Sequence, residues 1–227
     1  MKSLAKKIAT TIPHKQLERI SVYSILRDNF ASIYDTNLFK TKEKLWDNLL
    51  IDNVKRDEKI VLLEFGVYEG YSIKYFSDIN TNKYSKFFGF DSFEGLPEDW
   101  TSLHDKGHFS TNGAVPAVND ARINFVKGWF SDTLVSFKEH HPEIFEDRKI
   151  IKIVHFDADL YSSTLFLLTQ LWRSNDEYYF IFDEFLGHET RALYNFSQSY
   201  PITIKFFGHT RDNYGYPNQV CGQFLAA

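Results

Sequence analysis

The sequence has 227 residues, of which 43% are hydrophobic and 17% aromatic, so it holds enough apolar side chains to bury the core of one domain spanning residues 1–227. Its 26 basic and 30 acidic residues give a formal net charge of −4, and the basic residues are scattered, which argues against nucleic acid as a partner because phosphate backbones are bound by clustered Lys and Arg. The single cysteine, Cys221, excludes an intrachain disulfide, and no window approaches the roughly 18 apolar residues of a membrane span, so we expect a cytoplasmic protein without a membrane partner.

Residues 1–55 are predicted to form N-terminal helices. Apolar side chains recur at helical spacing over residues 16–34 and again over residues 42–54. These helices either pack beside the core or cover the mouth of a ligand site, and the sequence does not choose between the two roles. Their apolar faces are also compatible with a homodimer.

From residue 60 the pattern changes to short apolar runs that end in Gly or acidic residues and are followed by helical patterns, which is typical of repeated βα units. The first five strands are expected at residues 60–65, 86–90, 123–126, 150–156 and 178–182, with helices after the first, third, fourth and fifth. Two further runs, at 202–207 and 219–225, suggest a closing antiparallel pair at one edge of the sheet. The sequence therefore predicts an α/β fold with a mostly parallel, seven-stranded sheet.

Residues 99–119 are rich in polar and small side chains and have no clear apolar period. Long loops in compact domains are often functional. We therefore interpret this segment as a loop that can act as a lid.

Acidic residues recur at the ends of the predicted strands. A single carboxylate at such a position can simply cap the next helix, but recurrence after four strands favours a ligand site, because α/β sheets bind ligands at the carboxyl ends of their strands. The residues concerned are Glu64, Asp91, Asp157, Asp159, Asp183 and Glu184.

The turn after the first strand contains Gly66 and Gly70, which let the chain turn sharply and approach a ligand. By itself this is a weak signal, since strand-to-helix turns also use glycine for structural reasons. The spacing G-x-x-x-G differs from the dinucleotide fingerprint and so disfavours a nicotinamide oxidoreductase. After the second strand, Asp91 occupies the position where a carboxylate accepts the hydroxyl protons of a ribose.

Four linked motifs lead from fold to family. Asp91 is followed by Ser-Phe-Glu-Gly-Leu-Pro at 92–97, residues 128–134 read Gly-Trp-Phe-Ser-Asp-Thr-Leu, residues 155–164 read His-Phe-Asp-Ala-Asp-Leu-Tyr-Ser-Ser-Thr, and residues 182–185 read Phe-Asp-Glu-Phe. Together they resemble the macrocin O-methyltransferase family, in the same order, from about Glu64 to Glu184.

The resemblance implies a Rossmann-like class I methyltransferase fold with helices on both faces of the sheet. It also implies S-adenosylmethionine as methyl donor and, as in several family members, Mg²⁺-dependent methylation of a hydroxyl on a sugar or glycosylated small molecule. By position, the cofactor's methionine part is assigned to Glu64, Gly66 and Gly70, its ribose to Asp91 with Ser92 and Phe93 nearby, and its adenine to Gly128, Trp129 and Phe130. Tyr68 is a further candidate for stacking on the cofactor or the acceptor.

The same resemblance maps the family's acidic positions onto Asp157, Asp159, Asp183 and Glu184. We expect Asp157, Asp183 and Glu184 to hold Mg²⁺, with Asp157 also counted among the catalytic and the cofactor-binding residues. Asp159 is then the leading candidate for the general base. The sequence departs from the family pattern at Ala158, where Gly is usual, and at Glu184, where a second Asp is usual. Glu184 makes the metal less certain than the cofactor, because Mg²⁺ demands near-ideal octahedral geometry.

Histidines are rival bases, with His108 and His188 ahead because both are expected in loops. His155 is expected either to point away from Asp157 or to pack in the sheet, although strand alternation leaves its direction open. The alternative to an enzyme is a non-catalytic protein of this fold that binds S-adenosylmethionine as a regulatory or scaffolding module.

Overall fold

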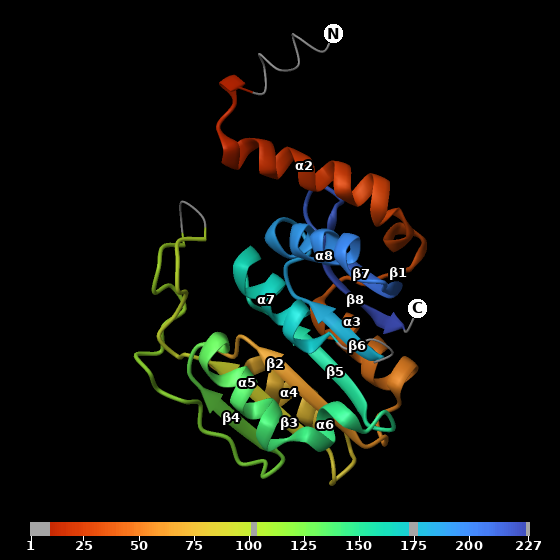
Figure 1. Ribbon diagram of the computed structural model, residues 1–227. Helices are drawn as coiled ribbons and strands as arrows, with labels where there is room; N and C mark the ends of the chain where they lie inside the picture. The colour runs from red at the N-terminus through yellow and green to blue at the C-terminus, as the bar shows by residue number, and fades with distance from the viewer. Residues whose placement is uncertain (1–9, 101–103, 173–176, 226–227) are drawn as a thin grey trace.

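The computed structural model describes residues 10–100, 104–172 and 177–225, which form one central sheet covered by helices on both faces (Figure 1). Residues 1–9, part of the predicted N-terminal helical region, and residues 101–103 of the predicted lid lie outside the described residues. The strands are β1 (Asn37–Leu38), β2 (Ile60–Phe65), β3 (Lys86–Asp91), β4 (Ile123–Lys127), β5 (Ile151–Phe156), β6 (Tyr178–Phe182), β7 (Thr203–Arg211) and β8 (Pro217–Leu225).

The strand order is β1-β7-β8-β6-β5-β2-β3-β4. Strands β6, β5, β2, β3 and β4 pair in parallel, whereas β8 pairs antiparallel with both β6 and β7. From β2 the chain moves outward to β3 and β4 and then returns to β5 on the other side of β2. The order therefore reverses between β2 and β5, and the carboxyl ends of these two strands flank the position where open α/β sheets bind ligands.

The sheet has eight strands, one more than the seven predicted, although its mostly parallel α/β architecture is the predicted one. The additional strand, β1, is only two residues long and pairs in parallel with Gly208 and His209 of β7. A two-residue strand has no alternation of side chains that a sequence pattern could reveal. Its pairing is a tertiary contact, which only the folded chain defines.

Helices cover both faces, as predicted. Helices α2, α5, α7 and α8 lie over one face, and α3, a π-helical turn and α4 lie over the other. Within the described ranges, no helix has the length and apolar character needed to cross a membrane. The helices are α2 (His14–Asn29), α3 (Lys42–Asp47), α4 (Tyr71–Ile79), α5 (Phe130–His140), α6 (Pro142–Glu146), α7 (Tyr161–Leu171) and α8 (His188–Ser199), with a 3₁₀ turn at Ala31–Asp35 and the π-helical turn at Asn48–Val54.

Strand alternation decides which side chains reach which layer. In β2, Leu63 and Phe65 belong to the apolar cluster under α5, α7 and α8, whereas Leu62 belongs to the cluster under α3 and α4. Glu64 is therefore directed to the α3/α4 side of the sheet. The same alternation in β5 directs His155 to that side, because its neighbour Phe156 packs on the opposite face.

Candidate active site

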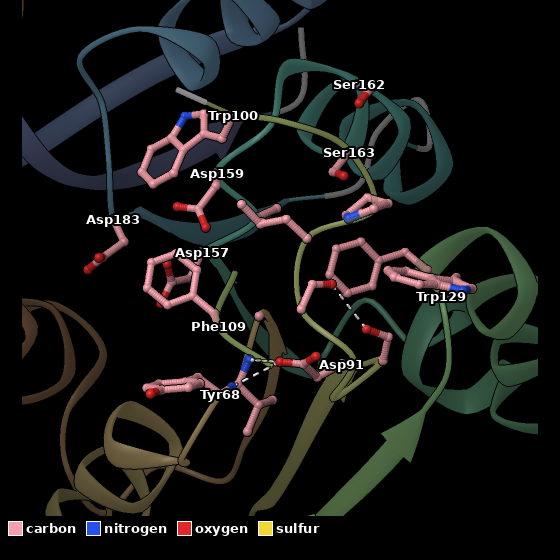
Figure 2. A pocket seen from close by; sticks show the side chains of 18 of the residues that line it. Tyr68, Asp91, Trp100, Phe109, Trp129, Asp157, Asp159, Ser162, Ser163 and Asp183 are labelled. Atoms are coloured by element: carbon pink, nitrogen blue, oxygen red, sulfur yellow. Dashed lines mark hydrogen bonds between the residues drawn. The ribbon is translucent and has the colours of Figure 1, made fainter. Parts of the chain in front are cut away.

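A cavity of about 640 Å³ opens at the carboxyl ends of β2, β3, β5 and β6, where the strand order reverses (Figure 2). This volume lies within the range of about 300–1,000 Å³ that is usual for small-molecule sites. In the view of Figure 2, Asp157, Asp159 and Asp183 gather on one side of the cavity and Trp129 lies on the other, with Asp91 below and between them.

The turn between β2 and α4 forms part of the cavity wall through Gly66 and Tyr68. Gly66 has a φ of +98°, and a Cβ at this position would lie 1.9 Å from the carbonyl oxygen of Asp157. Only glycine therefore lets the β2 turn lie directly against the segment that follows β5. Gly70 does not line the cavity; it adopts the left-handed conformation as the N-cap of α4.

Asp91 anchors that turn with both of its carboxylate oxygens. Oδ2 accepts hydrogen bonds from the backbone N–H groups of Val67 (2.8 Å) and Tyr68 (2.9 Å) (Figure 2). Oδ1 accepts one from the backbone N–H of Phe93 (2.7 Å). A carboxylate offers about four acceptor positions, so these three bonds leave about one for a ligand. Asp91 lines the cavity and is only partly buried.

The N-terminus of α5 forms the wall opposite the carboxylates, with Trp129, Phe130 and Ser131 lining the cavity. Gly128, just before them, does not line it. Its φ is +142°, and a Cβ there would lie 2.7 Å from Thr133 Cγ2, so glycine is needed to start the helix at this angle.

The segment after β3 contributes Ser92 to the cavity but not Phe93. Phe93 is fully buried with a φ of +60°, and its carbonyl accepts hydrogen bonds from the backbone N–H groups of Thr111 and Gly113. Phe93 thus holds the later loop against the sheet and does not contact the cavity itself.

The described part of the predicted lid covers the cavity mouth with aromatic side chains. Trp100, His104 and Phe109 line the cavity together with Tyr68, whose ring lies 5.7 Å from that of Phe109. Backbone hydrogen bonds join Leu96 to Gly107 and to His108, each at 2.9 Å. The described part of the loop is therefore tied to the segment that follows β3.

Besides Asp91, four carboxyl groups line the cavity: Asp157 and Asp159 after β5, and Asp183 and Glu184 after β6. Burial, reinforced by the charge of Asp183, raises the pKa of Asp157 well above its usual range. Burial and nearby carboxylates, first Glu184, raise the pKa of Asp159 to about 7. Burial and Asp183 raise the pKa of Glu184 to about 7. Such shifts mark a site that favours the binding of positive charge.

Two charged residues near this cluster did not stand out in the sequence. Lys42, at the start of α3, lines the cavity and places its Nζ 3.8 Å from Asp183 Oδ1. Glu189 of α8 is almost fully buried, and its Oε2 accepts a hydrogen bond from the backbone N–H of Glu184 at 3.1 Å. Neither residue belongs to a strand-end motif, which is the signal by which the other acidic residues were found.

His155 proves to be part of the cluster. It pairs across the strands with Glu64, and both side chains are fully buried, with 3.0 Å between His155 Nδ1 and Glu64 Oε2. Its other ring nitrogen, Nε2, lies 4.0 Å from Asp183 Oδ1. One ligand atom each from His155, Asp157 and Asp183 fall within 4.8 Å of one another, close enough to share a metal ion.

The structure places several predicted site residues away from the cavity lining. Glu64 does not line the cavity; it is fully buried against His155. His108 packs its ring 4.5 Å from His104 and 4.4 Å from Phe109, and of these three only His108 does not line the cavity. His188 lies at the start of α8, where its Nδ1 accepts a hydrogen bond from the backbone N–H of Tyr161 at 3.3 Å.

Comparison with known proteins places this geometry in context. A family model described as Macrocin-O-methyltransferase (TylF) matches residues 42–205, whereas no curated protein matches the sequence. Among solved structures, the calicheamicin methyltransferase CalS11 is 18% identical over 95% of this chain and 93% of that chain, with a TM-score of 0.54. An O-methyltransferase from Bacillus cereus, solved in complex with SAH, is 13% identical over 98% and 97% of the two chains, with a TM-score of 0.51. At these identities the two structures show a shared fold.

Proposed function

The chain belongs to the macrocin O-methyltransferase family, and from this premise we propose that it methylates a hydroxyl of a sugar or glycosylated small molecule with the help of a divalent cation. It is an S-adenosylmethionine-dependent O-methyltransferase with a Rossmann-like fold, and its acceptor is a small molecule. One observation supports cation-assisted transfer to a sugar hydroxyl: Asp157, Asp159 and Asp183 line the same cavity as the turn that Asp91 anchors.

We assign the cofactor to the side of the cavity formed by Gly66, Asp91 and Trp129. S-adenosylmethionine supplies a methyl group bound to a sulfonium sulfur. When the methyl group is transferred, this sulfur leaves as a thioether. The acceptor position left on the Asp91 carboxylate suits a ribose hydroxyl. Gly66 also lines the cavity, at the position where the family resemblance puts the methionine part. The indole of Trp129 and the ring of Phe130 offer flat surfaces for adenine.

Asp159 is our candidate for the general base. In the transfer the acceptor oxygen attacks the methyl carbon, the carbon–sulfur bond breaks with its electron pair going to sulfur, and the hydroxyl proton passes to the Asp159 carboxylate. A base works best when its pKa is near the operating pH, and burial together with Glu184 raises the pKa of Asp159 to about 7. Asp159 also has a φ of +58°, a backbone conformation uncommon outside glycine and found at functional sites.

The chain's own residues fit a divalent cation beside this base. Asp183 Oδ1 is buried without a hydrogen-bond partner in the described chain, and Asp157 lies within metal-sharing distance of it. A bound cation would supply Lewis acidity, which lowers the pKa of a coordinated hydroxyl. Asp157 and Asp183 would hold it, with Glu184 as the third ligand that the family pattern implies.

The aromatic cavity mouth supports a sugar as the acceptor. Trp100, Phe109 and Tyr68 offer apolar ring faces against which the C–H face of a sugar packs, while the carboxylates opposite receive its hydroxyl groups. Such a combination of apolar faces and convergent acceptors fits a polyhydroxylated ring better than a purely apolar molecule.

The test is methyl transfer from radiolabelled S-adenosylmethionine to a panel of nucleoside-diphosphate sugars, simple glycosides and catechol, with Mg²⁺ and with Mn²⁺. We expect labelled product from at least one sugar-containing acceptor and none after removal of metal with a chelator. Methylation of catechol alone, or turnover that the chelator does not change, would contradict the proposal. Asp132→Asn is the matched control, because Asp132 belongs to the first turn of α5 and does not line the cavity.

A further inference from the structure

The ring of His155 lies among apolar side chains on the α3/α4 side of the sheet. It is fully buried, lies 5.8 Å from the ring of Trp46 and 5.3 Å from that of Phe76, and its Nε2 has no hydrogen-bond partner among the described residues. A buried polar atom without a partner costs about 1–3 kcal/mol. Such an atom calls for an explanation, and a bound ion is one of the recognised explanations.

Glu64 determines which nitrogen of the His155 imidazole carries the proton and which has the free lone pair. Glu64 and His155 are direct cross-strand partners, and Glu64 Oε2 lies 3.0 Å from His155 Nδ1. When Nδ1–H donates to the carboxylate, the lone pair is on Nε2. Metal-binding histidines usually show this arrangement, in which the second ring nitrogen donates to a carboxylate that fixes the tautomer and the orientation of the ring.

Nε2 is aimed at the carboxylate cluster. It lies 4.0 Å from Asp183 Oδ1, which is too long for a hydrogen bond. This distance is about the largest that two ligand atoms can have when each lies about 2 Å from one ion. Asp183 Oδ1 is itself buried without a hydrogen-bond partner in the part of the chain that the structure describes. Two atoms that make no hydrogen bond in the described chain thus lie near each other beside Asp157.

We propose that the divalent cation is held by His155 Nε2, Asp157 and Asp183, with Glu64 orienting the imidazole, and that this site prefers transition-metal ions such as Mn²⁺ and Co²⁺ to Mg²⁺. This inference rests on the proposed metal-assisted function and replaces Glu184 as the third ligand. Imidazole is a ligand for transition metals, whereas Mg²⁺ favours oxygen donors. One nitrogen and two carboxylates therefore shift the preference away from Mg²⁺.

Glu184 and Lys42 have other tasks in this arrangement. Glu184 is not among the residues whose ligand atoms group with His155; its carboxyl lines the cavity, where it is available to the acceptor. Lys42 Nζ lies 3.8 Å from Asp183 Oδ1, and its side chain is 37% exposed. It can therefore swing toward solvent when a cation binds.

The test begins with calorimetric titration of the metal-free full chain with MnCl₂, CoCl₂ and MgCl₂, without cofactor or acceptor. We expect Mn²⁺ and Co²⁺ to bind about tenfold or more tightly than Mg²⁺. His155→Gln is expected to weaken Mn²⁺ binding by about 100-fold, and Glu64→Gln by about 10–100-fold, the usual effect of removing an orienting carboxylate. Glu184→Gln is expected to change it by less than about threefold, the size of effect usual for a substitution that removes no ligand atom.

A second measurement does not depend on a variant that folds. Pulsed electron paramagnetic resonance of the Mn²⁺-loaded wild type is expected to show coupling to a ¹⁴N nucleus of the imidazole, and the coupling is expected to disappear in His155→Gln. The matched control is His209→Gln, because His209 is also fully buried but lies in β7 against Thr36. Its thermal stability shows what loss of a buried histidine does by itself.

Absence of nitrogen coupling, preference for Mg²⁺, or weakening by Glu184→Gln in place of His155→Gln would each overturn this ligand set. The methyl-transfer assay separates the two proposals. Metal binding with nitrogen coupling but no transfer to any sugar would contradict only the proposed function. Transfer supported by an all-oxygen Mg²⁺ site would contradict only the ligand set.

Discussion

Replacement of Asp91 by Asn is the sharpest test of the cofactor side of the cavity. Asp91 uses both carboxylate oxygens, Oδ2 for the N–H groups of Val67 and Tyr68 and Oδ1 for that of Phe93. Asn has one acceptor oxygen, so at least one bond is lost and an amide NH₂ then faces a backbone N–H. A hydrogen bond to a charged group contributes about 1.5–3 kcal/mol, which corresponds to a decrease in melting temperature of about 3–12 °C for a chain of this size.

The loss of cofactor affinity is expected to be of similar size. Asp91→Asn both loosens the turn and removes negative charge from the acceptor position assigned to the ribose, so we expect S-adenosylmethionine to bind about tenfold or more weakly in calorimetry, at least about 1.4 kcal/mol. Circular dichroism melting of the same samples measures the loss of stability.

Asp212→Asn is the matched control. Asp212 also accepts two backbone N–H groups, from Tyr214 and Tyr216, but both bonds end on Oδ1. Asn retains that oxygen, so this substitution is expected to leave the melting temperature and the cofactor affinity nearly unchanged. If Asp91→Asn binds S-adenosylmethionine as tightly as the wild type and melts at the same temperature, our account of the Asp91 turn is wrong.

Three further predictions concern the cavity and the sheet. Gly66→Ala places a Cβ 1.9 Å from the Asp157 carbonyl oxygen, so we expect a loss of several kcal/mol of stability in urea unfolding and no measurable cofactor binding. Asp159→Asn is expected to lower kcat by about 10²–10⁴-fold while the calorimetric affinity for the cofactor stays within about threefold; an unchanged kcat would exclude Asp159 as the base. Burial lowers the pKa of His209 to about 4, so the folded state binds fewer protons than the unfolded state between pH 4 and about 6.5. The free energy of unfolding should therefore fall as pH drops through this window, and the fall should be smaller in His209→Gln.

The predicted strands and the acidic strand ends follow from local patterns. The apolar run of β2 and the acidic residue that ends β3 are readable in any window of a few residues, and parallel pairing then brings their carboxyl ends to one edge. This is why the sequence alone predicts that Asp91, Asp157 and Asp183 share one ligand site, and all three line the same cavity.

The role of His155 could not be predicted in this way. Alternation relative to Asp157 left its direction open, and its function depends on the register that sets it opposite Glu64. Register is a property of two strands far apart in the chain. The same holds for β1, which pairs with β7, far along the chain. The cavity lining does not include Glu64, His108 or His188. Register pairs Glu64 with His155, and the predicted roles of these three residues toward cofactor and acceptor stay predictions.

The position of β8 between β6 and β7 has a consequence for synthesis on the ribosome. Residues 217–225 are synthesised after all the other described strands. They nevertheless fill an interior position of the sheet, between β6 and β7, and not an edge. While they are still inside the exit tunnel, β7 has no partner toward β6, and the edge of β6 exposes unpaired backbone groups on which a strand of another molecule can pair. The nascent chain therefore exposes the edge of β6 from the time β6 emerges until β8 pairs with it.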